Sequence, residues 1–187
     1  IVEAGANRLL VDLQSADAAA IAASSVLAMQ LEIPLGTVIA AARIARAADT
    51  TVMLNAAPIR DLPAELLSSL DIRVVNEHEA SHLAGERDWR ELTEQVPVVV
   101  VTLGSEGALL LRRGSDEVRV AAPSVHAVDA TGAGDTFCGA FAAGLAEDME
   151  LEQALRFAVT AASLSVQSYG AVPSIPLRAQ IDAATSR

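Results

Sequence analysis

The sequence predicts an α/β fold with a mostly parallel sheet. Short runs of valine, leucine and isoleucine alternate with longer alanine-rich amphipathic runs along the 187 residues, the order that strand–helix–strand units produce. The strongly apolar run at 98–103 suits a strand that is covered on both faces. No repeat, low-complexity tract or obvious linker interrupts this order, so we expect residues 1–187 to form one domain.

The expected elements follow from the local pattern and from the residues that bound them. Strands are predicted at 26–31, 51–54, 72–75 and 98–103, and a hairpin is predicted to join 108–111 to 118–121. Helices are predicted at 35–48, 77–83, 134–146 and 151–166. Pro34 suits the start of the first of these helices, and Gly85 suits the end of the second.

Composition restricts the chemistry that the chain can carry out. The net charge of −11 argues against general nucleic-acid binding, because a polyanion is repelled. All 13 basic residues are arginines, so a P-loop lysine, a protein-kinase lysine and a Schiff-base lysine are excluded. An anionic substrate would therefore have to be held by backbone amides, arginine or a metal ion.

Cys138 is the one cysteine, so no intrachain disulfide can form, and a reducing, cytoplasmic setting is expected. We interpret Cys138 as a small packing residue rather than a reactive thiol. No signal-peptide pattern occurs at the N-terminus, and no apolar run reaches the roughly 20 residues of a membrane span. We expect no membrane partner.

The densest signal is a glycine turn, the string D-A-T-G-A-G-D-T-F at 129–137, which follows an extended stretch and opens a helix. Small residues let backbone N–H groups approach an anion closely, and the helix N-terminus adds partial positive charge. Together they can stabilise charge on a transferring phosphoryl group without lysine. The alternative is that Gly132 and Gly134 only make a turn.

Asp135 lies in the first turn of that predicted helix, beside the glycines. A carboxylate there can accept the proton of an attacking hydroxyl group. In phosphoryl transfer the nucleophile can keep its proton until late, so a weak base is sufficient. The alternative role for Asp135 is capping of the helix.

A second motif competes for the function. His78-Glu79-Ala80-Ser81-His82 is literally H-E-x-x-H, which on a helix places two imidazoles on one face with a glutamate as general base. A zinc peptidase is therefore a remote alternative. It lacks an evident third ligand, because His126 is the only other histidine.

The glycine turn resembles the signature near the C-terminus of ribokinase-type (PfkB-type) carbohydrate kinases. Further segments resemble that family in the same order: Gly5-Ala6-Asn7, Gln30-Leu31-Glu32-Ile33-Pro34, Asn55-Ala56-Ala57-Pro58, Asn76-Glu77-His78-Glu79, Thr102-Leu103-Gly104-Ser105-Glu106-Gly107 and Pro173-Ser174-Ile175-Pro176. The resemblance covers essentially the whole chain. It implies a ribokinase-like three-layer α/β/α fold.

The resemblance also implies a role for each matching position. Asp135 would be the catalytic base, and Gly132, Ala133 and Gly134 the anion hole. Asn76 would contact ATP phosphates, and Glu79 would organise Mg²⁺ through water. The nucleotide would be lined by Thr102, Gly104, Ser105, Glu106 and Gly107, with Gly134 also contacting it. A K⁺ ion would be held by Asp129, Thr131, Ser165, Ser168, Gly170 and Ser174.

Glu32 would bind the sugar, and the Q-L-E-x-P segment points to D-ribose, which ATP would convert to ribose 5-phosphate. Taken alone, Asn76 is better explained as a turn residue at a strand end and Glu79 as an exposed helix residue, while Glu32 is equally well explained as a charged residue that ends a strand. Members of this family are longer, and the N-terminal third with its lid is expected to be missing here. The full-length family member is expected to be a homodimer. The alternatives are another sugar or nucleoside kinase and an inactive truncated fragment.

Overall fold

The computed structural model describes residues 5–185. The chain forms two compact units, Ile1–Val99 with Arg112–Gly114, and Val100–Leu111 with Ser115–Arg187. The boundary falls within strand β4, so each unit contains part of this strand. The sequence predicts one domain, and the number of independently folding domains stays a prediction.

Six strands form one sheet, in which hydrogen-bonded neighbours follow the chain order from β1 to β6. The strands are β1 (Val26–Met29), β2 (Thr51–Asn55), β3 (Ile72–Asn76), β4 (Val98–Thr102), β5 (Ala108–Arg112) and β6 (Val118–Val120). The β1–β2 and β2–β3 pairs are parallel, with Val26 opposite Thr51 and Met53 opposite Ile72. The β5–β6 pair is the antiparallel hairpin that the sequence predicted. The α/β class with a mostly parallel sheet is confirmed.

The first unit contains β1 to β3 and the start of β4, together with short and long helices. These are the 3₁₀ helices η1 (Gly5–Leu9) and η2 (Trp89–Glu94), and the α-helices α1 (Ser15–Ala22), α2 (Leu35–Ala47), α3 (Ala64–Leu67) and α4 (Glu77–Ala84). Helix α2 contacts β1 and β2. It buries a stripe of small residues, Val38, Ala41, Ala42 and Ala45, at helical spacing. This stripe explains how an alanine-rich chain builds a core with few aromatic residues.

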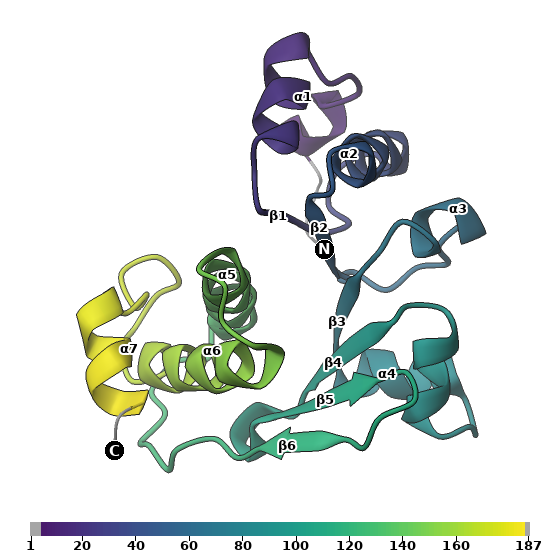
Figure 1. Cartoon of the computed structure of the whole chain (residues 1–187). Helices are drawn as coiled ribbons and strands as arrows, with labels where there is room; N and C mark the ends of the chain where they lie inside the picture. Colours follow the sequence, from purple (N-terminus) through teal and green to yellow (C-terminus); the bar gives the residue numbers. More distant parts are fainter. Residues whose placement is uncertain (1–4, 186–187) are drawn as a thin grey trace. The chain divides into compact units, whose positions relative to one another are not determined.

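The second unit contains the end of β4, η3 (Gly104–Glu106), β5 except its last residue, β6 and three helices, α5 (Ala133–Ala146), α6 (Leu151–Ser165) and α7 (Arg178–Thr185). Helices α5 and α6 lie side by side, and α7 packs on α6 (Figure 1). Phe157, Ala161 and Ile181 form a buried cluster that joins α6 to α7. A Cβ atom on Gly144 would lie 3.2 Å from that of Ala154, so Gly144 lets α5 approach α6 closely.

The predicted helices at 134–146 and 151–166 are confirmed to within one residue at each end. Helices α1, α3 and α7 were not predicted. Helix α1 buries none of its residues, and α3 has four residues, so neither has a periodic apolar face that a sequence pattern could reveal. Within residues 5–185, no helix is both long enough and apolar enough to cross a membrane.

Candidate functional site

The glycine turn is held in place by hydrogen bonds to Asp129. One carboxylate oxygen of Asp129, Oδ1, accepts from the amide of Thr131 at 2.9 Å and from its hydroxyl at 2.6 Å. The other oxygen, Oδ2, accepts from the amide of Gly170 at 2.8 Å. The amides of Val128 and Asp129 both donate to the carbonyl of Val166 at the end of α6. These bonds therefore attach the residues that precede α5 to the C-terminal end of α6.

Gly132 is the N-cap residue of α5 and has a left-handed backbone, with φ of 76°. Glycine adopts this conformation without the steric cost that a side chain would bring. The amide of Ala133 donates to the carbonyl of Ala130 at 3.2 Å. The amides of Gly132 and Gly134 have no hydrogen-bond acceptor within residues 5–185, so both are available to an anion. Of the three residues of the predicted anion hole, two thus have unpaired amides.

Asp135 is exposed in the first turn of α5. Gly132 and Asp135 are among the residues that line a cavity of about 510 Å³. Gly134 is exposed, and a Cβ atom there would meet no neighbouring atom of the described chain within 4 Å. Space for a ligand exists next to Asp135, as proton transfer from a bound hydroxyl group requires.

The residues predicted to hold K⁺ are partly brought together. Asp129 is hydrogen-bonded to both Thr131 and Gly170. The amide of Ser168 donates to the carbonyl of Ser165. The hydroxyls of Ser165 and Ser174 donate to the carbonyls of Ala162 and Ala171, at 2.8 and 2.9 Å. The side-chain and carbonyl oxygens of these residues are the kind of ligand that a hard monovalent cation prefers.

The hydrogen bonds at Asp129 lower the pKa of its carboxyl group below the usual value. The hydroxyl of Thr131 is the largest cause, followed by the amides of Gly170 and Thr131. A carboxyl group whose pKa is lower in the folded state stabilises the fold at pH values above its unfolded pKa of about 3.9. This contribution is lost as the pH falls through the folded pKa.

We therefore expect wild-type protein to exceed Asp129→Asn in melting temperature at neutral pH, and this difference to shrink below pH about 4. Thermal unfolding between pH 3 and 7, followed by circular dichroism, measures the effect. Asp148→Asn is the matched control, because the Asp148 side chain is exposed and has no hydrogen-bond partner within the described chain. A difference for Asp129→Asn that does not change with pH would contradict the role of these bonds.

In the first unit, the predicted sugar and phosphate residues follow the carboxyl ends of parallel strands. Glu32 is exposed three residues after β1, and Asn76 ends β3. Because β1, β2 and β3 are parallel, these residues lie at the same edge of the sheet, where open α/β sheets bind ligands. The side-chain amide of Asn7 lies 3.5 Å from Glu32 Oε2, at the limit of a hydrogen bond.

Asn76 and Glu79 form a capping box at the start of α4. The amide of Glu79 donates to Asn76 Oδ1, and the amide of Asn76 donates to Glu79 Oε2, both at 2.8 Å. Taken alone, the two positions suggest a turn residue and an exposed helix residue, and sequence reasoning missed this paired role. The N-x-x-E spacing itself was the signal. One oxygen of Glu79, Oε1, has no protein donor within residues 5–185, and it is the atom that Mg²⁺-bound water could contact.

Arg73 is a further charged residue that sequence reasoning missed. It lies on β3 with 2% of its surface exposed, and its Nε atom has no hydrogen-bond partner among residues 5–185. Its Nη1 atom lies 3.5 Å from Gln95 Oε1. Burial lowers the pKa of Arg73, and the negative charge of Glu79 acts in the opposite direction. An arginine in a strand pattern gives no sign of burial, so no signal in the sequence could have found it.

The segment Thr102 to Gly107 connects β4 to β5 through η3. Gly104, Ser105 and Glu106 are exposed, and Glu106 forms an ion pair with Arg119. Gly107 is buried, and a Cβ atom there would lie 2.0 Å from the carbonyl oxygen of Val120. The missing side chain of Gly107 therefore allows close packing against the chain's own backbone.

The zinc-peptidase alternative has no support. His78, Glu79 and His82 do lie on α4, but Glu79 accepts the hydrogen bond from the amide of Asn76. No group of three or more His, Cys, Asp or Glu side chains that could hold a metal ion occurs in the part of the chain from residue 5 to 185. The motif is a coincidence of the capping box and two helix histidines.

The sheet order and the glycine turn that opens α5 define a ribokinase-like α/β fold. The structure of Arabidopsis thaliana ribokinase complexed with ribose and ATP matches the whole chain with a TM-score of 0.92 and 33% identity, over 64% of that chain. Residues 3–178 match the pfkB family of carbohydrate kinases. The chain belongs to this family.

Two relatives indicate the range of activities around this sequence. A ribokinase of Staphylococcus aureus (strain COL) is 39% identical over 194 residues, which cover 97% of this chain and 63% of the relative. A deoxyribokinase of Salmonella typhi is 35% identical over 159 residues, covering 79% of this chain and 52% of the relative. The chain therefore spans less than two thirds of the length of these relatives.

Proposed function

We propose that the protein containing this chain transfers the γ-phosphoryl group of ATP to D-ribose, giving ribose 5-phosphate and ADP. The observation that carries the proposal is the pair of unpaired amides of Gly132 and Gly134 beside the exposed carboxylate of Asp135, where Gly132 and Asp135 also line a cavity. Ribose is favoured over other acceptors because the relatives with 39% and 33% identity are both named ribokinase.

In this proposal the oxygen of the ribose 5-hydroxyl group forms a bond to the γ-phosphorus, and Asp135 accepts the proton of that hydroxyl group. The bond from that phosphorus to the bridging oxygen breaks, and ADP leaves with the electron pair. The amides of Gly132 and Gly134, at the N-terminus of α5, stabilise the negative charge on the transferring group. The chain supplies this stabilisation without lysine.

The remaining predicted residues have supporting roles. Glu32 accepts hydrogen bonds from sugar hydroxyls, and Asn76 contacts phosphate oxygens. The nucleotide contacts predicted for Thr102, Gly104, Ser105, Glu106, Gly107 and Gly134 stay part of the proposal. Mg²⁺, near Glu79 through water, would neutralise phosphate charge. K⁺, held by oxygens of Asp129, Thr131, Ser165, Ser168, Gly170 and Ser174, would add positive charge near the anion hole.

A second candidate is a sister activity on another sugar or nucleoside. A relative that is 35% identical is named deoxyribokinase, which makes 2-deoxyribose the first alternative acceptor to compare with ribose. A comparison of ribose with 2-deoxyribose and adenosine as acceptors separates these activities. The inactive-fragment alternative predicts no turnover with any of them.

We expect ribose-dependent release of ADP from this chain with Mg²⁺-ATP, faster in K⁺ than in Na⁺. A coupled ADP assay measures it, with acceptor-free reactions as the control for ATP hydrolysis and the Staphylococcus aureus ribokinase as the positive control. Absence of ribose-dependent ADP, while the positive control turns over, would contradict activity of this chain. Faster turnover with 2-deoxyribose than with ribose would show that 2-deoxyribose, and not ribose, is the preferred substrate.

A further inference from the structure

Residues 170–177, which we call the strap, connect the end of α6 to α7 and contact the glycine turn at their first two residues. The amide of Gly170 donates to Asp129 Oδ2 at 2.8 Å. Ala171 lies against Gly132, since a Cβ atom on Gly132 would be 2.9 Å from the Cβ atom of Ala171. A shift of the strap therefore changes the surroundings of both Asp129 and Gly132.

Most side chains in the middle of the strap are exposed, and Ser174, at 7% exposure, is the buried one. The strap lines the cavity of about 510 Å³ together with three small residues of α5, Gly139, Ala140 and Ala143. Val172 and Ile175 remain 77% and 55% exposed. The hydrogen bonds in this stretch are local, from Ser174 to Ala171 and from Ile175 to Val172. Besides the buried Ser174, the strap is held at its two ends.

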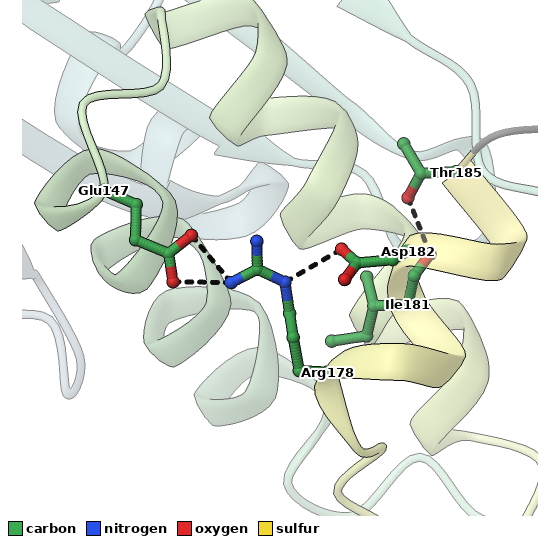
Figure 2. A network of polar contacts seen from close by, with 5 residues as sticks. All are labelled: Glu147, Arg178, Ile181, Asp182 and Thr185. Atoms are coloured by element: carbon green, nitrogen blue, oxygen red, sulfur yellow. Dashed lines mark hydrogen bonds and ion pairs between the residues drawn. The ribbon is translucent and has the colours of Figure 1, made fainter.

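The second end of the strap is fastened by Arg178, the first residue of α7 (Figure 2). Its Nη1 atom donates to both carboxylate oxygens of Glu147, at 2.5 and 2.7 Å, and its Nε atom donates to Asp182 at 2.8 Å. Its guanidinium carbon lies 4.9 Å from the centre of the Phe157 ring. Because Glu147 is the C-cap residue of α5 and Phe157 lies on α6, one side chain joins three helices.

We expect the contacts of Arg178 to affect the position of the strap more than the free energy of unfolding. The side chains of Arg178 and Glu147 are 46% and 47% exposed, and exposed ion pairs contribute little to the free energy of unfolding. Hydrogen bonds to Glu147 and then Asp182 raise the pKa of Arg178 above its usual value, so the guanidinium stays charged throughout the working range. A contact at the end of a segment limits local unfolding of that segment.

We propose that Arg178 is a positioning residue for the glycine turn: by binding Glu147 it fixes the far end of the strap, and thereby holds Gly170 on Asp129 and Ala171 on Gly132. The consequence for catalysis rests on the proposed function, because it assumes that the glycine turn and Asp129 serve phosphoryl transfer and the cation. The positional part does not need that assumption.

Amide hydrogen exchange tests the positional part. In Arg178→Gln we expect exchange in peptides covering the turn and the strap to rise about fivefold or more, while the interior of α6 stays as in wild type. Glu147→Gln should reproduce this pattern. Arg156→Gln is the matched control, because Arg156 is an exposed arginine on α6 whose side chain has no partner within the described chain. Unchanged exchange in the strap, or a uniform rise across α5 and α6, would overturn the proposal.

A titration of turnover with K⁺ tests the catalytic part. In Arg178→Gln we expect the K⁺ concentration for half-maximal rate to rise several-fold, with kcat at saturating K⁺ close to that of wild type. A merely structural role would leave this concentration unchanged, and that result would overturn the catalytic part. If the wild-type chain shows no turnover, activity of this chain is contradicted, and the exchange comparison alone decides the role of Arg178.

Discussion

Asp135→Asn is expected to remove nearly all ribose-dependent ADP release while leaving ATP binding largely intact. The substitution keeps the size of the side chain and removes its ability to take up the proton of the attacking hydroxyl group. Loss of a general base typically lowers the rate by about 10²–10⁴-fold. The amides of Gly132 and Gly134 do not depend on the carboxylate, so phosphate binding should persist.

The measurement is the coupled assay, together with binding of ATP by calorimetry. Asp148→Asn is the matched control, because it makes the same change of charge on an exposed residue just beyond the C-terminal end of α5. Retention of most of the turnover in Asp135→Asn would remove Asp135 from the role of base. Equal loss of turnover and ATP binding would instead indicate that the carboxylate supports the fold of the turn.

Gly107→Ala is expected to destabilise the second unit strongly. Gly107 has φ of 99° and ψ of −126°, a backbone region that side chains disfavour, and its added Cβ atom would lie 2.0 Å from the carbonyl oxygen of Val120. Backbone strain and overpacking each cost about 1–3 kcal/mol, so we expect a loss of about 4 kcal/mol. The neighbour is backbone of the β5–β6 hairpin and cannot rotate away.

Urea unfolding, followed by circular dichroism, measures this loss. Gly114→Ala is the matched control, because Gly114 also has a positive φ, of 72°, but a Cβ atom there would meet no neighbouring atom of the described chain within 4 Å. The control should lose about 1 kcal/mol from backbone strain alone. Equal losses for the two variants would show that the contact with Val120 is relieved at no cost, which contradicts close packing at Gly107.

Local features of this protein were predictable from its sequence. The alternation of apolar and amphipathic runs predicted β2, β3, α5 and α6 to within a residue or two, because burial of one face imposes a period on each element. The glycine turn was predictable for a similar reason. An anion hole at a helix N-terminus needs small residues and a carboxylate within a few positions of one another. The residues of the proposed anion hole and the proposed base therefore lie within one short string.

Other features depend on residues that are far apart in the chain. Asp129 meets Gly170, 41 positions later, and Arg178 meets Glu147, 31 positions earlier. The burial of Arg73 and the close contact of Gly107 with Val120 likewise arise only once the strands pair. Such contacts have no local period, because their partners meet only when the chain has folded. The class of fold and the proposed chemistry of the turn follow from local sequence, whereas the contacts that hold the turn in place come from packing between distant segments.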